Sequence, residues 1–139
     1  MNDLLVEGKQ ILDSQTFSKL LGAKLVALSK KYAELSLPIK DSFKQNYGFV
    51  HGGVISYLAD NCLTFAGASI LGHCVTSEYK INYLMPAMGK ELVAKSTVVS
   101  FSLRQAVCEC KIYAVDHSKE SLVAIAQGTI VRIDMEQLK

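Results

Sequence analysis

One carboxylate lies in the middle of a long apolar segment. The stretch NYGFVHGGVISYLADNCLTFAGASILG, residues 46–72, reads as a glycine-rich turn that leads into a helix, with Asp60 near the centre of that helix. A carboxylate on a helix that is apolar nearly all round must leave water, and leaving it unpaired costs on the order of several kcal/mol. Asp60 is therefore either held by hydrogen bonds or reactive. A structural carboxylate bonded to Ser56 or Thr64 is the plainer of these alternatives.

Two glycines, Gly52 and Gly53, stand at the start of this helix. They let a ligand approach the backbone closely, and they lie where the first amides of the helix point outward without partners. Partial positive charge collects there, so an oxyanion that develops at either amide would be stabilised. A plain turn accounts for the same glycines. His51, Gln45 and Asn46 likewise either act in this site or only fix the loop that carries them.

The spacing between the glycine turn and the carboxylate favours a site shared by two subunits. Asp60 lies eight residues beyond Gly52, which is about 12 Å further along an ideal helix. One copy of the helix cannot bring both groups to one reacting carbon. If two copies pack with antiparallel helices, Asp60 of one approaches the glycine turn of the other. Thr64, one turn beyond Asp60, falls on the same face and could bond the carboxylate or hold a water.

The segments around this helix predict a sheet that covers it. A short amphipathic helix is expected over residues 4–12, followed by a hairpin within residues 22–39 that Pro38 ends. The long helix is expected to end at Gly72. Four strands should follow in meander order: VTSEYKINYLMP, KELVAKSTVVSFSL, QAVCECKIYAVD and ESLVAIAQGTIVRI. The sequence thus predicts one α+β domain over residues 1–139, in which an antiparallel sheet curves around one very apolar helix.

Composition argues against several classes of function. The formal net charge is +2 and the lysines are scattered, which disfavours a nucleic-acid-binding protein. The first residues mix acids with apolar side chains, unlike a signal peptide, so we expect a cytoplasmic protein. Polar residues interrupt the apolar run of residues 54–71, which favours a buried helix over a membrane span. The cysteines lack metal-ligand spacing and are expected to be reduced core thiols: Cys62, Cys74, Cys108 and Cys110.

The motif and the strand pattern resemble the hot-dog-fold acyl-CoA thioesterases, specifically the phenylacetate-degradation-type branch. The resemblance rests on Gly48, on the HGG of residues 51–53, on Asp60 nine residues past the histidine, and on INYLMPA and AIAQGTIVRI in the strands that follow. It implies a hot-dog fold and hydrolysis of an acyl-CoA thioester with no metal or redox cofactor, CoA being part of the substrate. It also implies a homodimer or a tetramer of dimers, with the site at the dimer interface.

The resemblance implies a role for each residue of the motif. The amide of Gly52 would polarise the thioester carbonyl, and Asp60 would be either the nucleophile or the general base for water. Gln45 would orient the thioester, with Asn46 as the alternative if the loop is one residue shorter. Thr64 matches a threonine that some relatives use near the carboxylate.

Further residues are candidates for contact with the substrate. Thr76 or Ser77 falls where some relatives have a serine, and Gly53 continues the amide turn. Basic side chains could bind the phosphates of CoA, although a solvated surface charge is the plainer reading of each: Lys90, Arg104 and Lys111. Aromatic side chains could line the acyl pocket, although core packing is the plainer reading of each: Tyr57, Phe65 and Tyr83.

Two other functions fit the same fold. A non-catalytic acyl-CoA sensor or carrier would bind the ligand without hydrolysis, but a carboxylate together with an amide turn favours the enzyme. A hot-dog dehydratase typically has Phe-Pro after its histidine, which this chain lacks after His51. Acyl-CoA hydrolysis by a homo-oligomer is therefore the expected function.

Overall fold

Two short helices open the computed structural model, which describes residues 2–138. The first, α1 (Asp3–Ser14), begins at Asn2, whose side chain accepts a hydrogen bond from the amide of Leu4. It packs on strand β1 and buries Leu12. This helix confirms the expected one. A second helix, α2 (Thr16–Leu21), was not expected from the sequence; it ends at Gly22 in a left-handed conformation.

Six strands form one antiparallel sheet in the order β1-β2-β4-β5-β6-β3. Their bounds are β1 Lys24–Ser29, β2 Tyr32–Pro38, β3 Cys74–Tyr83, β4 Glu91–Phe101, β5 Gln105–Asp116 and β6 Lys119–Arg132. Two single-turn 3₁₀ helices, η1 (Asp41–Phe43) and η2 (Met135–Leu138), complete the elements. The β1–β2 hairpin and its end at Pro38 are confirmed.

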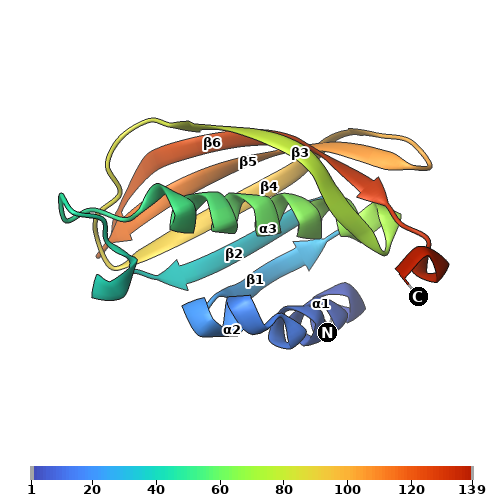
Figure 1. The fold of residues 1–139 in the computed structure, drawn as a ribbon, viewed down its shortest axis with the longest axis horizontal. Helices are drawn as coiled ribbons and strands as arrows, with labels where there is room; N and C mark the ends of the chain where they lie inside the picture. The colour runs from blue at the N-terminus through green and yellow to red at the C-terminus, as the bar shows by residue number, and fades with distance from the viewer. Residues whose placement is uncertain (1, 139) are drawn as a thin grey trace.

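The expected meander order of the last four strands is wrong for β3. β4, β5 and β6 do pair in succession, but β3 pairs with β6, and β4 pairs with β2 on its other side. The connection of residues 84–90 therefore crosses to a distant strand and does not close a hairpin (Figure 1). Alternation along the chain predicts a strand but not its neighbour. As a result β3 forms an edge of the sheet.

The long helix α3 (Gly52–Leu71) lies in the concave face of this sheet, as expected (Figure 1). It packs against all six strands and buries large side chains such as Leu58 and Leu63. Its length and hydropathy would suffice to cross a membrane, yet half of that apolar segment is buried inside the fold, as a core helix requires. It ends at Gly72, where φ is 78°.

The four cysteines are free thiols, as expected. Cys62 in α3 and Cys108 and Cys110 in β5 are buried, and Cys74 in β3 is half-buried. Burial raises the pKa of Cys74 to about 11, and burial is also the main reason that the pKa of Cys108 rises to about 12. The thiols of Cys74 and Cys108 therefore stay protonated at neutral pH and behave as small apolar groups.

Candidate active site

Four residues of α3, Gly52, Ser56, Asp60 and Thr64, form a line that faces β3. They are spaced four residues apart and therefore lie along one side of the helix. Side chains of β3 meet this line in reverse chain order. We call this line of contacts the α3–β3 seam; it consists of Gly52, Ser56, Asp60 and Thr64 on α3 and Thr76, Tyr79 and Tyr83 on β3.

Asp60 is held in the seam by Thr76. The hydroxyl of Thr76 donates to Asp60 Oδ1 at 2.6 Å, a length typical of a hydrogen bond to a carboxylate. Asp60 Oδ2 forms no hydrogen bond within residues 2–138, and the side chain is only half-buried. One carboxylate oxygen is therefore fixed by the protein and the other is available to a ligand.

Thr64 supports this arrangement indirectly. Its hydroxyl lies 2.9 Å from the backbone carbonyl oxygen of Asp60 and 2.9 Å from Thr76 Oγ1. Because Thr76 donates its only proton to the carboxylate, Thr64 can donate to either of these two oxygens. Direct bonding of the carboxylate by Thr64 or Ser56, as the structural interpretation of Asp60 required, does not occur.

A β-bulge in β3 aims Thr76 at the helix. The register between β3 and β6 shifts between Thr76 and Glu78, so that Ser77 is the extra residue. Thr76 and Tyr79 are three residues apart and would project from opposite faces of a regular strand. The bulge brings both onto the face of α3. Thr76 and Ser77 are the two candidates for the position at which some relatives have a serine. Thr76 lies in the seam, whereas Ser77 is exposed.

The helix N-terminus offers one free amide. His51 precedes α3, and its Nδ1 accepts a hydrogen bond from the amide of Gly53 at 2.8 Å, so the proton of the neutral ring lies on Nε2. The amide of Gly52 donates to no acceptor in the described part of the chain, while its carbonyl accepts a bond from the hydroxyl of Tyr83 at 3.0 Å. Gly52, and not Gly53, thus presents the unpaired donor where positive charge collects.

The loop before the helix uses Gln45 to close its own turn. Gln45 Oε1 accepts a hydrogen bond from the amide of Tyr47, and its backbone carbonyl accepts from Gly48 at 3.0 Å. Gly48 has φ of 91°, which favours glycine. The NH₂ group of Gln45 donates no hydrogen bond within residues 2–138, and Asn46 is exposed beside it. Which of the two orients a substrate stays a prediction.

The basic candidates do not converge on one place. Lys90 immediately precedes β4, Arg104 lies in the turn between β4 and β5, and Lys111 lies in the middle of β5. All three side chains are exposed. Within residues 2–138, no three His, Cys, Asp or Glu side chains converge as metal ligands would.

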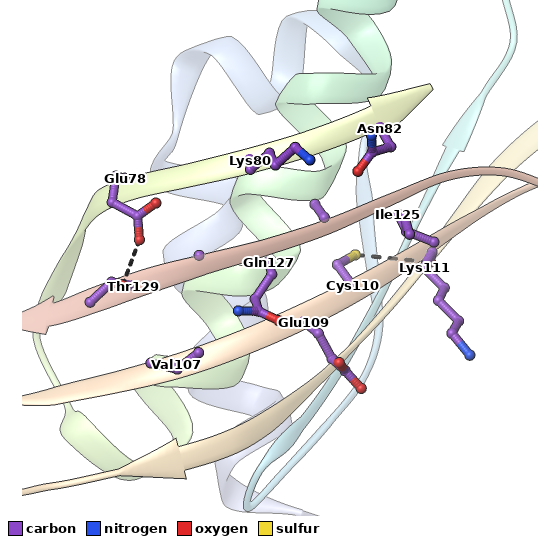
Figure 2. Close-up of a pocket in the computed structure, with 12 residues that line it drawn as sticks. Glu78, Lys80, Asn82, Val107, Glu109, Cys110, Lys111, Ile125, Gln127 and Thr129 are labelled. Carbon is purple, nitrogen blue, oxygen red and sulfur yellow. Dashed lines mark hydrogen bonds between the residues drawn. The ribbon is translucent and has the colours of Figure 1, made fainter. Parts of the chain in front are cut away.

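Lys111 lines a groove of about 480 Å³ on the outer face of the sheet, away from α3 (Figure 2). The side chains there are largely polar: Glu78 accepts a 2.6 Å hydrogen bond from Thr129, and Lys80 and Glu109 stand nearby. The buried residues of β5 and β6 point to the other side, toward the helix. This groove is therefore separated from the seam by the sheet.

A second cavity, of about 300 Å³, lies between α1 and α3 and borders the seam. Its wall is formed mainly by apolar side chains, including Ile11, Leu28 and Phe65. Thr64 belongs both to this wall and to the seam. Of the aromatic candidates, Phe65 thus lines a cavity that Thr64 joins to the seam.

A half-buried polar network that includes Gln15 and Asn61 forms one side of that cavity. Tyr57 donates to Ser18 at 2.6 Å, Ser18 donates to Gln15 at 2.6 Å, and Asn61 donates to Gln15 at 3.1 Å. Tyr57 also packs edge-on against Phe17. Tyr57 is therefore used to fix α2 on the central helix, which is the plainer of its two interpretations.

Sequence reasoning missed Tyr79 as a residue of the site and gave Ser56 only a structural role. Their hydroxyl groups bond each other in the seam. The one available signal was the broken alternation around Ser77, which places Tyr79 on the same face as Thr76 only if a bulge is assumed.

Comparison with known proteins shows which family this chain belongs to. The model of the thioesterase superfamily matches residues 47–121, a segment that includes α3, β3 and the whole seam. The chain belongs to the thioesterase superfamily. Membership in this family supports hydrolysis of thioesters as the general activity of the protein. It also confirms the resemblance drawn from the HGG motif and Asp60.

Individual relatives agree with this family. A protein of Archaeoglobus fulgidus, described as a candidate esterase, is 28% identical over 117 residues, which cover 84% of this chain and 74% of that protein. A thioesterase family protein from Silicibacter pomeroyi superposes with a TM-score of 0.89 at 25% identity, over 94% of this chain and 99% of that one. A single-residue variant of the phenylacetic acid degradation protein PaaI from Thermus thermophilus gives 0.74 at 26% identity, over 84% and 98%. The thioesterase has the hot-dog fold.

Proposed function

We propose that this thioesterase hydrolyses acyl-CoA or aryl-CoA thioesters to the free acid and CoA. The observation that carries the proposal is the seam itself. It combines a carboxylate that has one oxygen fixed by Thr76 with an amide at Gly52, and within residues 2–138 neither the second carboxylate oxygen nor this amide has a hydrogen-bond partner. These are the two groups that acyl transfer requires: a base or nucleophile, and a donor for the developing oxyanion.

Each group has a defined part in the reaction. In the base-assisted route, Asp60 takes a proton from water, the hydroxide attacks the thioester carbon, and the oxyanion is stabilised by the amide of Gly52 before the CoA thiolate leaves. In the direct route, the carboxylate attacks the thioester carbon, the C–S bond breaks and the CoA thiolate leaves; water then cleaves the resulting mixed anhydride to the free acid and the Asp60 carboxylate. Both routes need the same carboxylate, so the proposal covers both.

We propose further that the site is shared within a homodimer formed along β3. This strand is an edge of the sheet, and an unpaired edge invites pairing with another chain. Large apolar side chains are exposed on it and in the connection that follows: Val75, Tyr83, Leu84, Met85 and Met88. If two β3 edges pair antiparallel about a two-fold axis near the middle of the seam, Asp60 of one copy faces Gly52 of the other. A tetramer of such dimers is compatible with the polar outer face.

The cavity between α1 and α3 is the site proposed for the part of a longer acyl group that extends past its third carbon. Its apolar wall suits an alkyl or aryl group of modest size, and Thr64 places it next to Asp60. Four unpaired thiols fit a reducing compartment, which supports a cytoplasmic location.

The test replaces Asp60 with Asn and measures release of the CoA thiol from short aliphatic, long aliphatic and aryl acyl-CoAs. Asn keeps an oxygen that can accept the hydrogen bond of Thr76, so the fold is expected to persist. Loss of the base or nucleophile should lower kcat by about 10²-fold or more. Asp13→Asn, on the exposed face of α1, is the matched control.

The outcomes separate the possible functions. Turnover of one substrate class by wild type and by Asp13→Asn, with loss only in Asp60→Asn, would support the proposal. Unchanged turnover in Asp60→Asn would refute the role of the carboxylate. Binding of acyl-CoA by wild type without any turnover would make the protein a sensor or carrier instead.

A further inference from the structure

Ser56 and Tyr79 place a pair of hydroxyl groups in the seam between the free amide and the carboxylate. Their oxygens are hydrogen-bonded to each other, and either one can be the donor. Ser56 lies four residues from Gly52 and four from Asp60, so about 6 Å along the helix separates it from each. Both hydroxyl-bearing side chains are half-buried. The pair is therefore within reach of a molecule that occupies the seam.

The hydroxyl groups of Ser56 and Tyr79 have one more proton than their mutual hydrogen bond uses. Each hydroxyl carries one proton and two lone pairs, and the mutual bond uses one of the two protons. Within residues 2–138, neither Ser56 nor Tyr79 forms another side-chain hydrogen bond. One O–H group thus remains for water or for a ligand. A plain alkyl chain that covers the pair would remove this water and return no hydrogen bond, which is unfavourable.

The distance from the carboxylate limits which ligand atom can use this donor. The attacked carbon must lie about 3 Å from the attacking oxygen, and a hydrogen bond to the pair spans about 2.8 Å. An oxygen on the third carbon of an acyl chain is three bonds from the thioester carbon. It can therefore bridge the one helical turn between Asp60 and Ser56 while the thioester carbon stays near the carboxylate.

We propose that the seam selects acyl-CoA thioesters whose acyl group carries a hydroxyl or carbonyl oxygen on its third carbon, with Ser56 and Tyr79 as the specificity-determining residues. The spare O–H of the pair donates to this oxygen, and a substrate hydroxyl can also donate back to a lone pair of either residue. This inference rests on the proposed acyl-CoA hydrolysis at the same site and adds the substrate class.

The experiment compares kcat/KM for butanoyl-CoA, 3-hydroxybutanoyl-CoA and acetoacetyl-CoA by release of the CoA thiol. Wild type should favour the two oxygenated substrates by about tenfold or more, since a site that offers a hydrogen bond discriminates against an analogue that cannot make it. Ser56→Ala and Tyr79→Phe should each bring this ratio toward one. Tyr113→Phe is the matched control, because Tyr113 lies on the outer side of β5 and packs against Lys95; it should keep the wild-type ratio.

The measured quantity is the ratio of kcat/KM between oxygenated and plain substrates. A purely structural role of Ser56 and Tyr79 would leave this ratio unchanged. If both variants lose all three substrates in equal proportion and melt at lower temperature, the pair only supports the fold and the proposal is overturned. A wild-type ratio near one, or a ratio unchanged in both variants, also overturns it while leaving the thioesterase activity in place. Absence of turnover with every acyl-CoA tested would instead refute the hydrolysis on which the inference rests.

Discussion

Gly128 tests whether the geometry of the β3 bulge sets the activity. This residue of β6 pairs with Tyr79, directly beside the bulge. A Cβ atom at Gly128 would lie 2.6 Å from the carbonyl oxygen of Glu78 and 2.6 Å from Tyr79 Cβ, whereas ordinary contact begins at 3.4 Å. Gly128→Ala therefore requires β3 to move away from β6 by about 0.8 Å, the difference between these two distances.

Such a shift should lower kcat/KM strongly while lowering the free energy of unfolding only modestly. Overpacking of this kind costs about 1–3 kcal/mol in the free energy of unfolding. The displaced strand carries Thr76 and Tyr79, which contact Asp60 and Ser56. Because a misplacement of about 1 Å can cost 10²-fold in rate, kcat/KM should fall by about 10-fold to 10²-fold although Gly128 lies on β6, outside the seam.

The assay measures kcat/KM for acyl-CoA hydrolysis together with the free energy of unfolding in urea. Gly22→Ala serves as the control, since Gly22 has φ of 88° at the junction of α2 and β1, near the opposite edge of the sheet, and alanine there is strained. That variant should lose stability and keep kcat/KM within about threefold, as expected for a change far from the site. If Gly128→Ala is as active as Gly22→Ala at equal stability, the bulge does not position the site.

The remaining predictions concern the free amide, the shared site and the buried thiols. Gly52→Pro should remove the free amide and lower kcat by about 10²-fold to 10³-fold, and the backbone tolerates it because His51, at φ −62° and ψ 136°, suits the residue before proline. Co-assembly of Gly52→Pro with Asp60→Asn in equal amounts should restore roughly a quarter of wild-type activity, because half of the dimers are mixed and each has one intact shared site; no recovery would mean that each chain supplies its whole site. The raised pKa values of Cys74 and Cys108 predict that native protein resists alkylation by iodoacetamide at pH 8. Since folding favours the neutral thiols, stability should be full below the ordinary pKa of 9.0 and decline as pH rises from there toward 11 or 12; a melting temperature that stays constant to pH 11 would contradict the burial of these thiols.

Local features of the sequence were sufficient to predict most elements and to single out Asp60 as a candidate reactive group. The apolar run after the HGG turn predicts a buried helix, and its end at Gly72 follows from the conformational freedom of glycine. A carboxylate such as Asp60 within that run is costly to bury, which marks it as held or reactive without any knowledge of the fold. The alternation of side chains likewise predicts the strands, because the period of two is a property of each strand alone.

Only the tertiary structure decided how these elements meet. Strand order depends on long-range packing, so the edge position of β3 was not readable from its own alternation. The bulge at Ser77 depends on pairing with β6, and it alone turns both Thr76 and Tyr79 toward the helix. The sequence by itself thus determined which carboxylate could react, whereas the folded sheet determined which hydroxyl groups surround it, because register and contact across the sheet involve residues far apart in the chain.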